Sequence, residues 1–164
     1  MMHMWIVPVL IAVVLVGVDQ WTKYWAVTQL KPVGNITVVE GFLDFTFVEN
    51  RGVAFGVFSG QKWLILVLTA AIIVFLLYFF VKMPRTREYQ LVRAAMVPVL
   101  AGAVGNLLDR LFRGYVVDFF EITFISWPVF NMADIFVVTG VIALAILILF
   151  VIKEEPKIER KKDD

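Results

Sequence analysis

Four long apolar stretches constrain the fold of this chain more than any other feature. Each has the length that a helix needs to cross a bilayer, roughly 17–25 residues. They are Trp5–Tyr24, Trp63–Val81, Leu91–Leu108 and Asp134–Ile152. Only 18% of the residues are charged, whereas soluble domains carry about a quarter. We therefore predict a mainly α, polytopic membrane protein with four transmembrane helices.

The first stretch also resembles the apolar core of a secretory signal peptide. No basic segment precedes Trp5, and no small-residue cleavage site follows the stretch. A basic segment before the apolar core and a small-residue cleavage site after it are both typical of signal peptides. We therefore interpret it as a retained membrane helix.

The longest segment without helical character spans residues 31–62. Within it, turns with glycine frame Thr37–Val39 and Leu43–Phe47, two runs rich in strand-forming residues. We predict a small β hairpin on the membrane surface. Asn50–Gly56 follows, and its glycines would let the backbone approach another surface closely, although a plain turn is an alternative.

Lysine and arginine are distributed unevenly among the segments that join the spans. Basic residues are dense in the loop Lys82–Glu88 and in the tail Lys153–Asp164. The loops 31–62 and 109–133 contain basic residues that are spread over many more positions. Because basic residues accumulate on the cytoplasmic side of membranes, we predict that both termini are cytoplasmic. The polar ends of the first and third spans then converge on the outer face.

Two carboxylates stand in the apolar segment Tyr115–Phe136. Asp134 opens the fourth span, and ionisable groups at such a depth are costly and often functional. Asn131, three residues earlier, supports a second interpretation in which Asp134 only caps the helix. Asp118 lies between two apolar residues, and no helix start explains it.

Further polar residues lie near the ends of the first and third spans. Asp19 and Lys23 are four residues apart on one helical face. They form either an ion pair at the membrane interface, with the lysine reaching out of the membrane, or part of a site. Asn106, Asp109 and Arg110 share a face at the end of the third span. Asp109 is also compatible with a polar helix end that meets water, whereas Asn106 lies within the span.

The composition excludes several kinds of catalytic site. The chain has no cysteine and a single histidine, His3, so thiol nucleophiles, thiolate metal sites and Ser-His-Asp triads are excluded. Net charge is +1 and gives no indication of a nucleic-acid partner. Acid–base chemistry then depends on carboxylates.

Asp118 and Asp134, if brought together, would share a proton because two adjacent carboxylates resist simultaneous ionisation. One would activate water, while its protonated partner would polarise a carbonyl and later protonate the leaving nitrogen. We predict amide hydrolysis by this pair, with polar neighbours that orient it and hold the substrate backbone. These neighbours are Asn50, Asn106, Arg110 and Asn131.

Two other classes of membrane protein also place carboxylates in a bilayer. A transporter or proton channel would hold them nearer the middle of the membrane, often within internal repeats, and we identify no such repeat. A non-catalytic membrane scaffold would tolerate neutralisation of Asp118.

Five short motifs follow one another along the chain. They are Val18–Lys23, Glu49–Gly56, Gly105–Arg110, Val116–Phe119 and Phe130–Asp134. In this order they resemble the motif set of the lipoprotein signal peptidase, or signal peptidase II, family. The resemblance covers essentially the whole chain.

The resemblance implies an intramembrane aspartyl endopeptidase of the bacterial inner (cytoplasmic) membrane. Such an enzyme removes the signal peptide from diacylglyceryl-modified prolipoproteins on the N-terminal side of the lipidated cysteine. Asp118 and Asp134 match the catalytic pair. The supporting and substrate-binding positions are Asp19, Lys23, Asn50, Gly52, Asn106, Asp109, Arg110 and Asn131. No metal or other cofactor is implied. The implied partners are prolipoproteins, membrane lipids and the inhibitor globomycin, and not nucleic acid.

The resemblance also implies a domain organisation. Residues 1–152 would form a single four-helix transmembrane peptidase domain with outer loops at 31–62 and 109–133, and residues 153–164 a charged cytoplasmic tail. The active site would lie near the outer face beside a small extracytoplasmic β element. We expect five apolar side chains to cover the site in part: Phe42, Phe45, Phe47, Phe55 and Trp127.

Overall fold

The structure, a computed structural model, describes residues 3–52 and 60–150. In this part of the chain four helices are long and apolar enough to cross a membrane, as predicted. They are α1 (His3–Trp25), which continues as a π-helical segment η1 (Ala26–Leu30), α2 (Lys62–Lys82), α3 (Arg87–Phe112) and α4 (Met132–Phe150).

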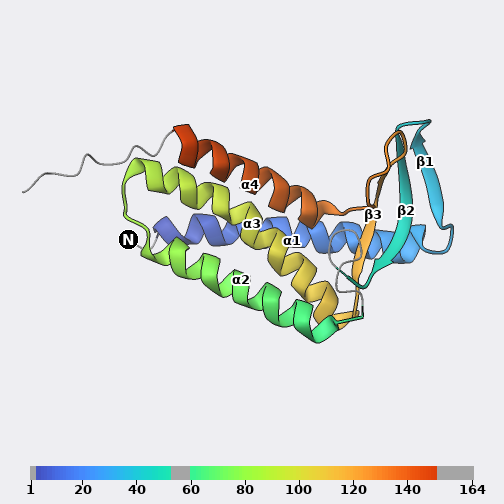
Figure 1. Ribbon diagram of the computed structural model, residues 1–164, viewed down its shortest axis with the longest axis horizontal. Coiled ribbons are helices and arrows are strands. Elements are labelled where there is room, and N and C mark those ends of the chain that lie inside the picture. The colour runs from blue at the N-terminus through green and yellow to red at the C-terminus, as the bar shows by residue number, and fades with distance from the viewer. Residues whose placement is uncertain (1–2, 53–59, 151–164) are drawn as a thin grey trace, which may run out of the picture.

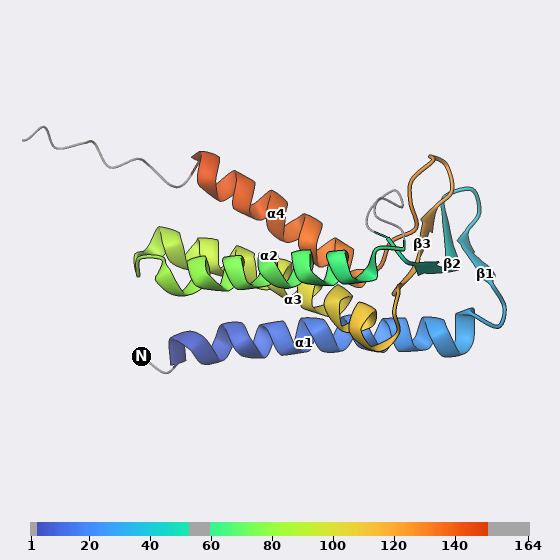
Figure 2. The ribbon, with the colours of Figure 1, turned by 60° about the horizontal axis from the view of Figure 1, so that its bottom comes forward.

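Helix α3 is the centre of the bundle. It packs against α1, α2 and α4 (Figures 1 and 2). Half of its apolar window is buried inside the protein, whereas the other three spans bury 11–17% of theirs. This burial agrees with the composition of α3, which is the least apolar of the four helices and has more polar and small residues, whereas α2 and α4 are apolar on all sides.

Glycines allow the helices around α3 to approach closely. A Cβ atom added at Gly102 would collide with the carbonyl oxygen of Ala133, and one added at Gly105 would collide with the carboxylate of Asp19. Small residues at such spacings are typical of close contacts between membrane helices. Gly140 of α4, which the sequence analysis did not single out, meets α3 in the same way.

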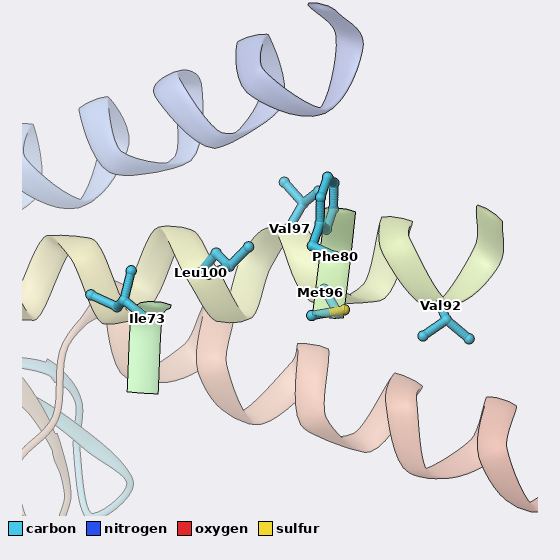
Figure 3. Packing of buried hydrophobic residues seen from close by; sticks show 6 residues of the cluster. All are labelled: Ile73, Phe80, Val92, Met96, Val97 and Leu100. Atoms are coloured by element: carbon cyan, nitrogen blue, oxygen red, sulfur yellow. The ribbon is translucent and has the colours of Figure 1, made fainter. Parts of the chain in front are cut away.

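A hydrophobic cluster joins α2 to α3 in the half of the bundle away from the sheet (Figure 3). Its buried members are Ile73, Phe80, Val92, Met96, Val97 and Leu100. Arg93 of α3 secures the end of α2, because its Nε donates to the carbonyl of Phe80 at 3.0 Å and its Nη2 to that of Met83. Basic groups at such helix ends satisfy carbonyls that lack a helical partner.

A three-stranded antiparallel sheet lies across one end of the bundle (Figure 1). Strands β1 (Asn35–Val39) and β2 (Leu43–Asn50) form the predicted hairpin, and both extend beyond the predicted runs. Strand β3 (Val116–Ile122), which was not predicted, pairs with β2 in the order β1-β2-β3. Helix α1 begins and α4 ends at the opposite end of the bundle.

The sheet is fixed to the helices by a second apolar cluster. Ala26 and Leu30 of η1 are buried against Val117 and Phe119 of β3. Aromatic side chains from α1 and β2 pack around this cluster, with the ring of Trp25 at 5.4 Å from that of Phe45 in an edge-on arrangement. This packing fixes the position of β3 relative to the helices.

Candidate active site

Asp118 lies in the middle of β3 and is 2% exposed. Asn50 donates from Nδ2 to its Oδ2 at 2.8 Å, and Asn131 from Nδ2 to its Oδ1 at 2.6 Å. Burial, and then the charge of Asp134, raise the pKa of Asp118 to about 6 against the opposing effect of the two amide donors. This carboxyl can therefore hold a proton close to neutral pH.

Asp134 lies in the first turn of α4 and has partners on two elements. The backbone N–H of Asn131 donates to its Oδ2 at 3.2 Å, and its own N–H donates to Asn131 Oδ1 at 3.1 Å. This reciprocal pair is a capping box, so the capping interpretation is structurally correct. The cap uses one oxygen, however, and Asn106 Nδ2 of α3 donates to the other at 2.9 Å.

Asn131 connects the two carboxylates. It is fully buried, and it contacts Asp118 through its amide nitrogen and Asp134 through its Oδ1 and backbone N–H. Its Nδ2 also donates to Asn106 Oδ1 at 3.3 Å. One residue thus fixes the position of each carboxylate relative to the other, because its side chain donates to the carboxylate of Asp118 and its backbone N–H to that of Asp134.

Lys23 is fully buried and has three partners. Its Nζ lies 3.0 Å from Asp19 Oδ2, 3.1 Å from Asp109 Oδ2 and 2.9 Å from Asn106 Oδ1. An ammonium has three N–H donors, so all three are satisfied. The alternative of an interfacial ion pair with an outward-reaching lysine is therefore wrong. Asp109 is also fully buried and is not a helix end that meets water.

The two aspartates that bind Lys23 also bind backbone. Asp19 Oδ1 accepts from the N–H of Ala133 at 3.0 Å, and Asp109 Oδ2 accepts from the N–H of Val117 at 3.0 Å. These N–H groups belong to the residues directly before the two site carboxylates. The lysine cluster therefore positions the backbone of both α4 and β3 where it enters the site.

Gln20 and Arg113 extend this cluster, and the sequence analysis did not assign them to the site. Gln20 Nε2 donates to Asp19 Oδ2 at 3.1 Å and to Asp109 Oδ1 at 3.2 Å, while its Oε1 accepts from Arg113 Nη1 at 3.1 Å. Arg113 also pairs with Asp109. Its spacing of four residues from Asp109 is a signal that could have identified it. Gln20 gives no such signal.

Arg110 connects α3 to the segment after β2. Its Nη2 donates to the carbonyl of Gly52 at 2.7 Å, and its Nη1 to the carbonyl of Asn106 at 3.3 Å. The N–H of Gly52 donates to Asn50 Oδ1 at 3.0 Å, so this segment is tied to the side chain that holds Asp118. Residues 53–59, which include most of the predicted glycine-rich loop, lie outside the described residues.

Both carboxylates line one cavity of about 1010 Å³. Its lining includes Asn50, Asn106 and Arg110, and it continues along α4 to Val138 and Thr139 and across to Thr69 of α2. The cavity therefore extends from the sheet into the membrane-spanning part, between α2 and α4. The part of the chain that the structure describes contains no group of three or more acidic or histidine side chains that could hold a metal ion.

The family model described as signal peptidase (SPase) II matches residues 11–150 of the chain. The chain belongs to the signal peptidase II family. This confirms the resemblance that the five motifs indicated, and it makes the chain a peptidase.

Relatives within the signal peptidase II family are similar over nearly their whole length. The lipoprotein signal peptidase of Clostridium acetobutylicum is 45% identical over 153 residues, which are 90% of this chain and 96% of that protein. That of Clostridioides difficile is 38% identical over 143 residues, 87% of this chain and 94% of that one. A solved structure described as a bacterial membrane enzyme matches with a TM-score of 0.79 and 34% identity, over 92% of this chain and 94% of that one.

All ten residues that the sequence analysis assigned to the signal peptidase II site are described, and hydrogen bonds or ion pairs connect them. Their roles in catalysis stay predictions. Among the aromatic residues expected to cover the site, Trp127 lines the cavity. Phe42 instead stacks on Phe124, and Phe45 packs on Trp25. Phe47 packs against the apolar cluster that holds the sheet, and Phe55 lies outside the described residues.

Proposed function

We propose that this member of the signal peptidase II family is an intramembrane aspartyl endopeptidase. Its substrates would be prolipoproteins that bear a diacylglyceryl cysteine, and it would remove the signal peptide on the N-terminal side of that cysteine. One observation carries the proposal: Asp118 and Asp134, bridged by Asn131, line a cavity that continues between membrane helices.

The mechanism requires one ionised and one protonated carboxyl. Asp134 lies at the N-terminus of α4, where the helix dipole favours negative charge, and we assign to it the role of base. Asp118, with its raised pKa, carries the shared proton. Asn131 and Asn106 hold the pair in this arrangement.

The reaction begins when the oxygen of a water molecule attacks the carbonyl carbon of the scissile bond. Asp134 takes a proton from this water, and Asp118 gives its proton to the carbonyl oxygen. As the tetrahedral intermediate collapses, the C–N bond breaks and the leaving nitrogen takes the proton from Asp134. Asp118 recovers its proton from a hydroxyl of the intermediate, which becomes the new carboxyl group.

The cavity also supports a lipid-anchored substrate. It reaches Thr69 of α2 and Val138 of α4, both within membrane-spanning helices. A substrate held in the bilayer by its acyl chains would therefore enter from the side, without leaving the membrane lipids. The distribution of basic residues supports an orientation in which the sheet and the site lie at the outer face of the bacterial inner membrane and both termini are cytoplasmic.

Amide substitutions of the two carboxylates test this function. We expect purified Asp118→Asn and Asp134→Asn variants to fold and to bind globomycin, a proposed substrate mimic, but to lose nearly all cleavage of a diacylglyceryl prolipoprotein. The double variant should be hardly worse than either single variant, because groups that act as one unit are non-additive. Turnover and globomycin binding are measured in the same detergent-solubilised samples.

Asp44→Asn is the matched control. Asp44 lies on β2 and accepts from Asn35 Nδ2 at 3.2 Å, and it does not line the cavity among the described residues. This variant should cleave like the wild type. Near-normal turnover by Asp134→Asn would mean that Asp134 only caps α4, and the proposed mechanism would then be wrong.

A further inference from the structure

Thr69 differs from the other threonines inside the helices. A threonine in a helix often donates its hydroxyl to a backbone carbonyl of the preceding turn. Thr22 and Thr28 do so, at 2.8 and 2.9 Å, and Thr139 does so at 2.7 Å. Within residues 3–52 and 60–150, no partner occupies the hydroxyl of Thr69. Among these residues, none competes with a ligand for its proton.

The hydroxyl of Thr69 belongs to the wall of the candidate active site. Among the described residues that line the cavity, α2 contributes only Thr69. It stands roughly 10 Å along α2 from Lys62, and Asn106 stands roughly 9 Å from Phe112 at the end of α3. Because α2 and α3 lie antiparallel and adjacent (Figure 1), Thr69 is at about the depth of the Asn106 amide.

An extended substrate needs a partner at this place. A peptide bond within a helix has its carbonyl engaged, so the segment to be cleaved must be extended, and its backbone groups then lack internal partners. In apolar surroundings an unpaired backbone group costs several kcal/mol. The other polar groups of the cavity come from α3, α4, the sheet and the segment after β2. On the side of α2, only the hydroxyl of Thr69 is available among the described residues.

We propose that Thr69 is a substrate-binding residue, whose hydroxyl donates a hydrogen bond to a backbone carbonyl of the extended segment beside the scissile bond. The inference rests on the proposed function and deepens it, because it places the signal peptide against α2. Thr139 lines the same cavity, but its hydroxyl proton is committed to the carbonyl of Ile135.

Substitutions of Thr69 with and without a hydroxyl group test this hydrogen bond. Thr69→Val should lower kcat/KM for the lipidated substrate by roughly 3–10-fold, the loss expected for one hydrogen bond, without a change in the unfolding temperature. Thr69→Ser keeps the hydroxyl and should restore cleavage. Thr28→Val is the matched control: the hydroxyl of Thr28 donates to the carbonyl of Tyr24 at 2.9 Å, and Thr28 is not among the described residues that line the cavity, so this variant should cleave like the wild type. If Thr69→Val also cleaves like the wild type, the inference is overturned.

A second measurement identifies the contact directly. In a series of lipidated peptides, single backbone amides are replaced by esters, whose carbonyl is a weaker acceptor. At one position the ester should slow the wild type but not slow Thr69→Val any further. Absence of such coupling at every position overturns the inference. If the wild type cleaves none of the lipidated substrates, the proposed function itself has failed, and this outcome is distinct from a Thr69 effect.

Discussion

At the scale of the residue, Asp118 makes the stability of the protein depend on pH. Its pKa is about 6 in the folded state, against an ordinary value of 3.8. Between these values the folded state keeps a proton that the unfolded state has released. The contribution of Asp118 to stability therefore falls as pH rises through this window, by on the order of 3 kcal/mol in all, and is constant above it. We predict that Asp118→Asn removes this slope, as measured by unfolding in micelles between about pH 4 and 7.

The comparison uses the slope and not the absolute stability. In Asp118→Asn the new amide places its own N–H group against one of the two amide donors, Asn50 or Asn131. Two facing donors lower the stability by an amount that does not depend on pH. This loss moves the whole curve without changing its shape. Asp44→Asn, which removes a carboxylate outside the cavity, should keep the wild-type slope. Parallel curves for Asp118→Asn and the wild type would show that Asp118 is ionised throughout.

At the scale of the element, the contact between α3 and α4 positions the site. Gly102 of α3 lies against the carbonyl oxygen of Ala133, directly before Asp134, and an added Cβ would also lie 2.8 Å from Val137 Cγ2. We predict that Gly102→Ala moves α4 away from α3 and lowers stability by about 1–3 kcal/mol, as overpacking generally does. Cleavage should fall further than the loss of folded protein explains, as measured by turnover per folded molecule.

Gly17→Ala is the control for this substitution. Gly17 lies in α1, and an added Cβ would have no atom within 4 Å. Because alanine is the better helix former by up to about 1 kcal/mol, this variant should be as stable as the wild type or more stable. Equal behaviour of the two alanine variants would mean that the close approach at Gly102 does not hold Asp134 in place.

At the scale of the whole molecule, local patterns were enough to predict the spans and the hairpin. An apolar run predicts a membrane helix by itself, and β1 and β2 are neighbours in the chain. Strand β3 is rich in strand formers, yet two membrane helices, α2 and α3, separate it in the sequence from its partner β2. Local composition does not reveal such a distant pairing, so the sheet was only partly predicted.

The site shows the same division between local and distant information. The pairing of Asp19 with Lys23 and the cap formed by Asn131 and Asp134 are visible in their spacing. The burial of Lys23 is not, because two of its three partners come from α3. The contact of Asn131 with Asp118 likewise depends on how β3 docks on the bundle. Motif resemblance gathered these residues in advance, but only the fold supplies their geometry.

The orientation of the whole molecule is open to a direct test, because the chain contains no cysteine. We predict that Glu40→Cys, in the exposed turn between β1 and β2, reacts with a membrane-impermeant maleimide in intact spheroplasts. Thr86→Cys, in the basic segment between α2 and α3, should react only after permeabilisation, because basic segments stay in the cytoplasm. The cysteine-free wild type gives the background. Neither position lines the cavity, so both variants should still cleave substrate. The reverse labelling pattern would put Asp118 and Asp134 at the cytoplasmic face and would contradict the proposed location of the active site at the outer face.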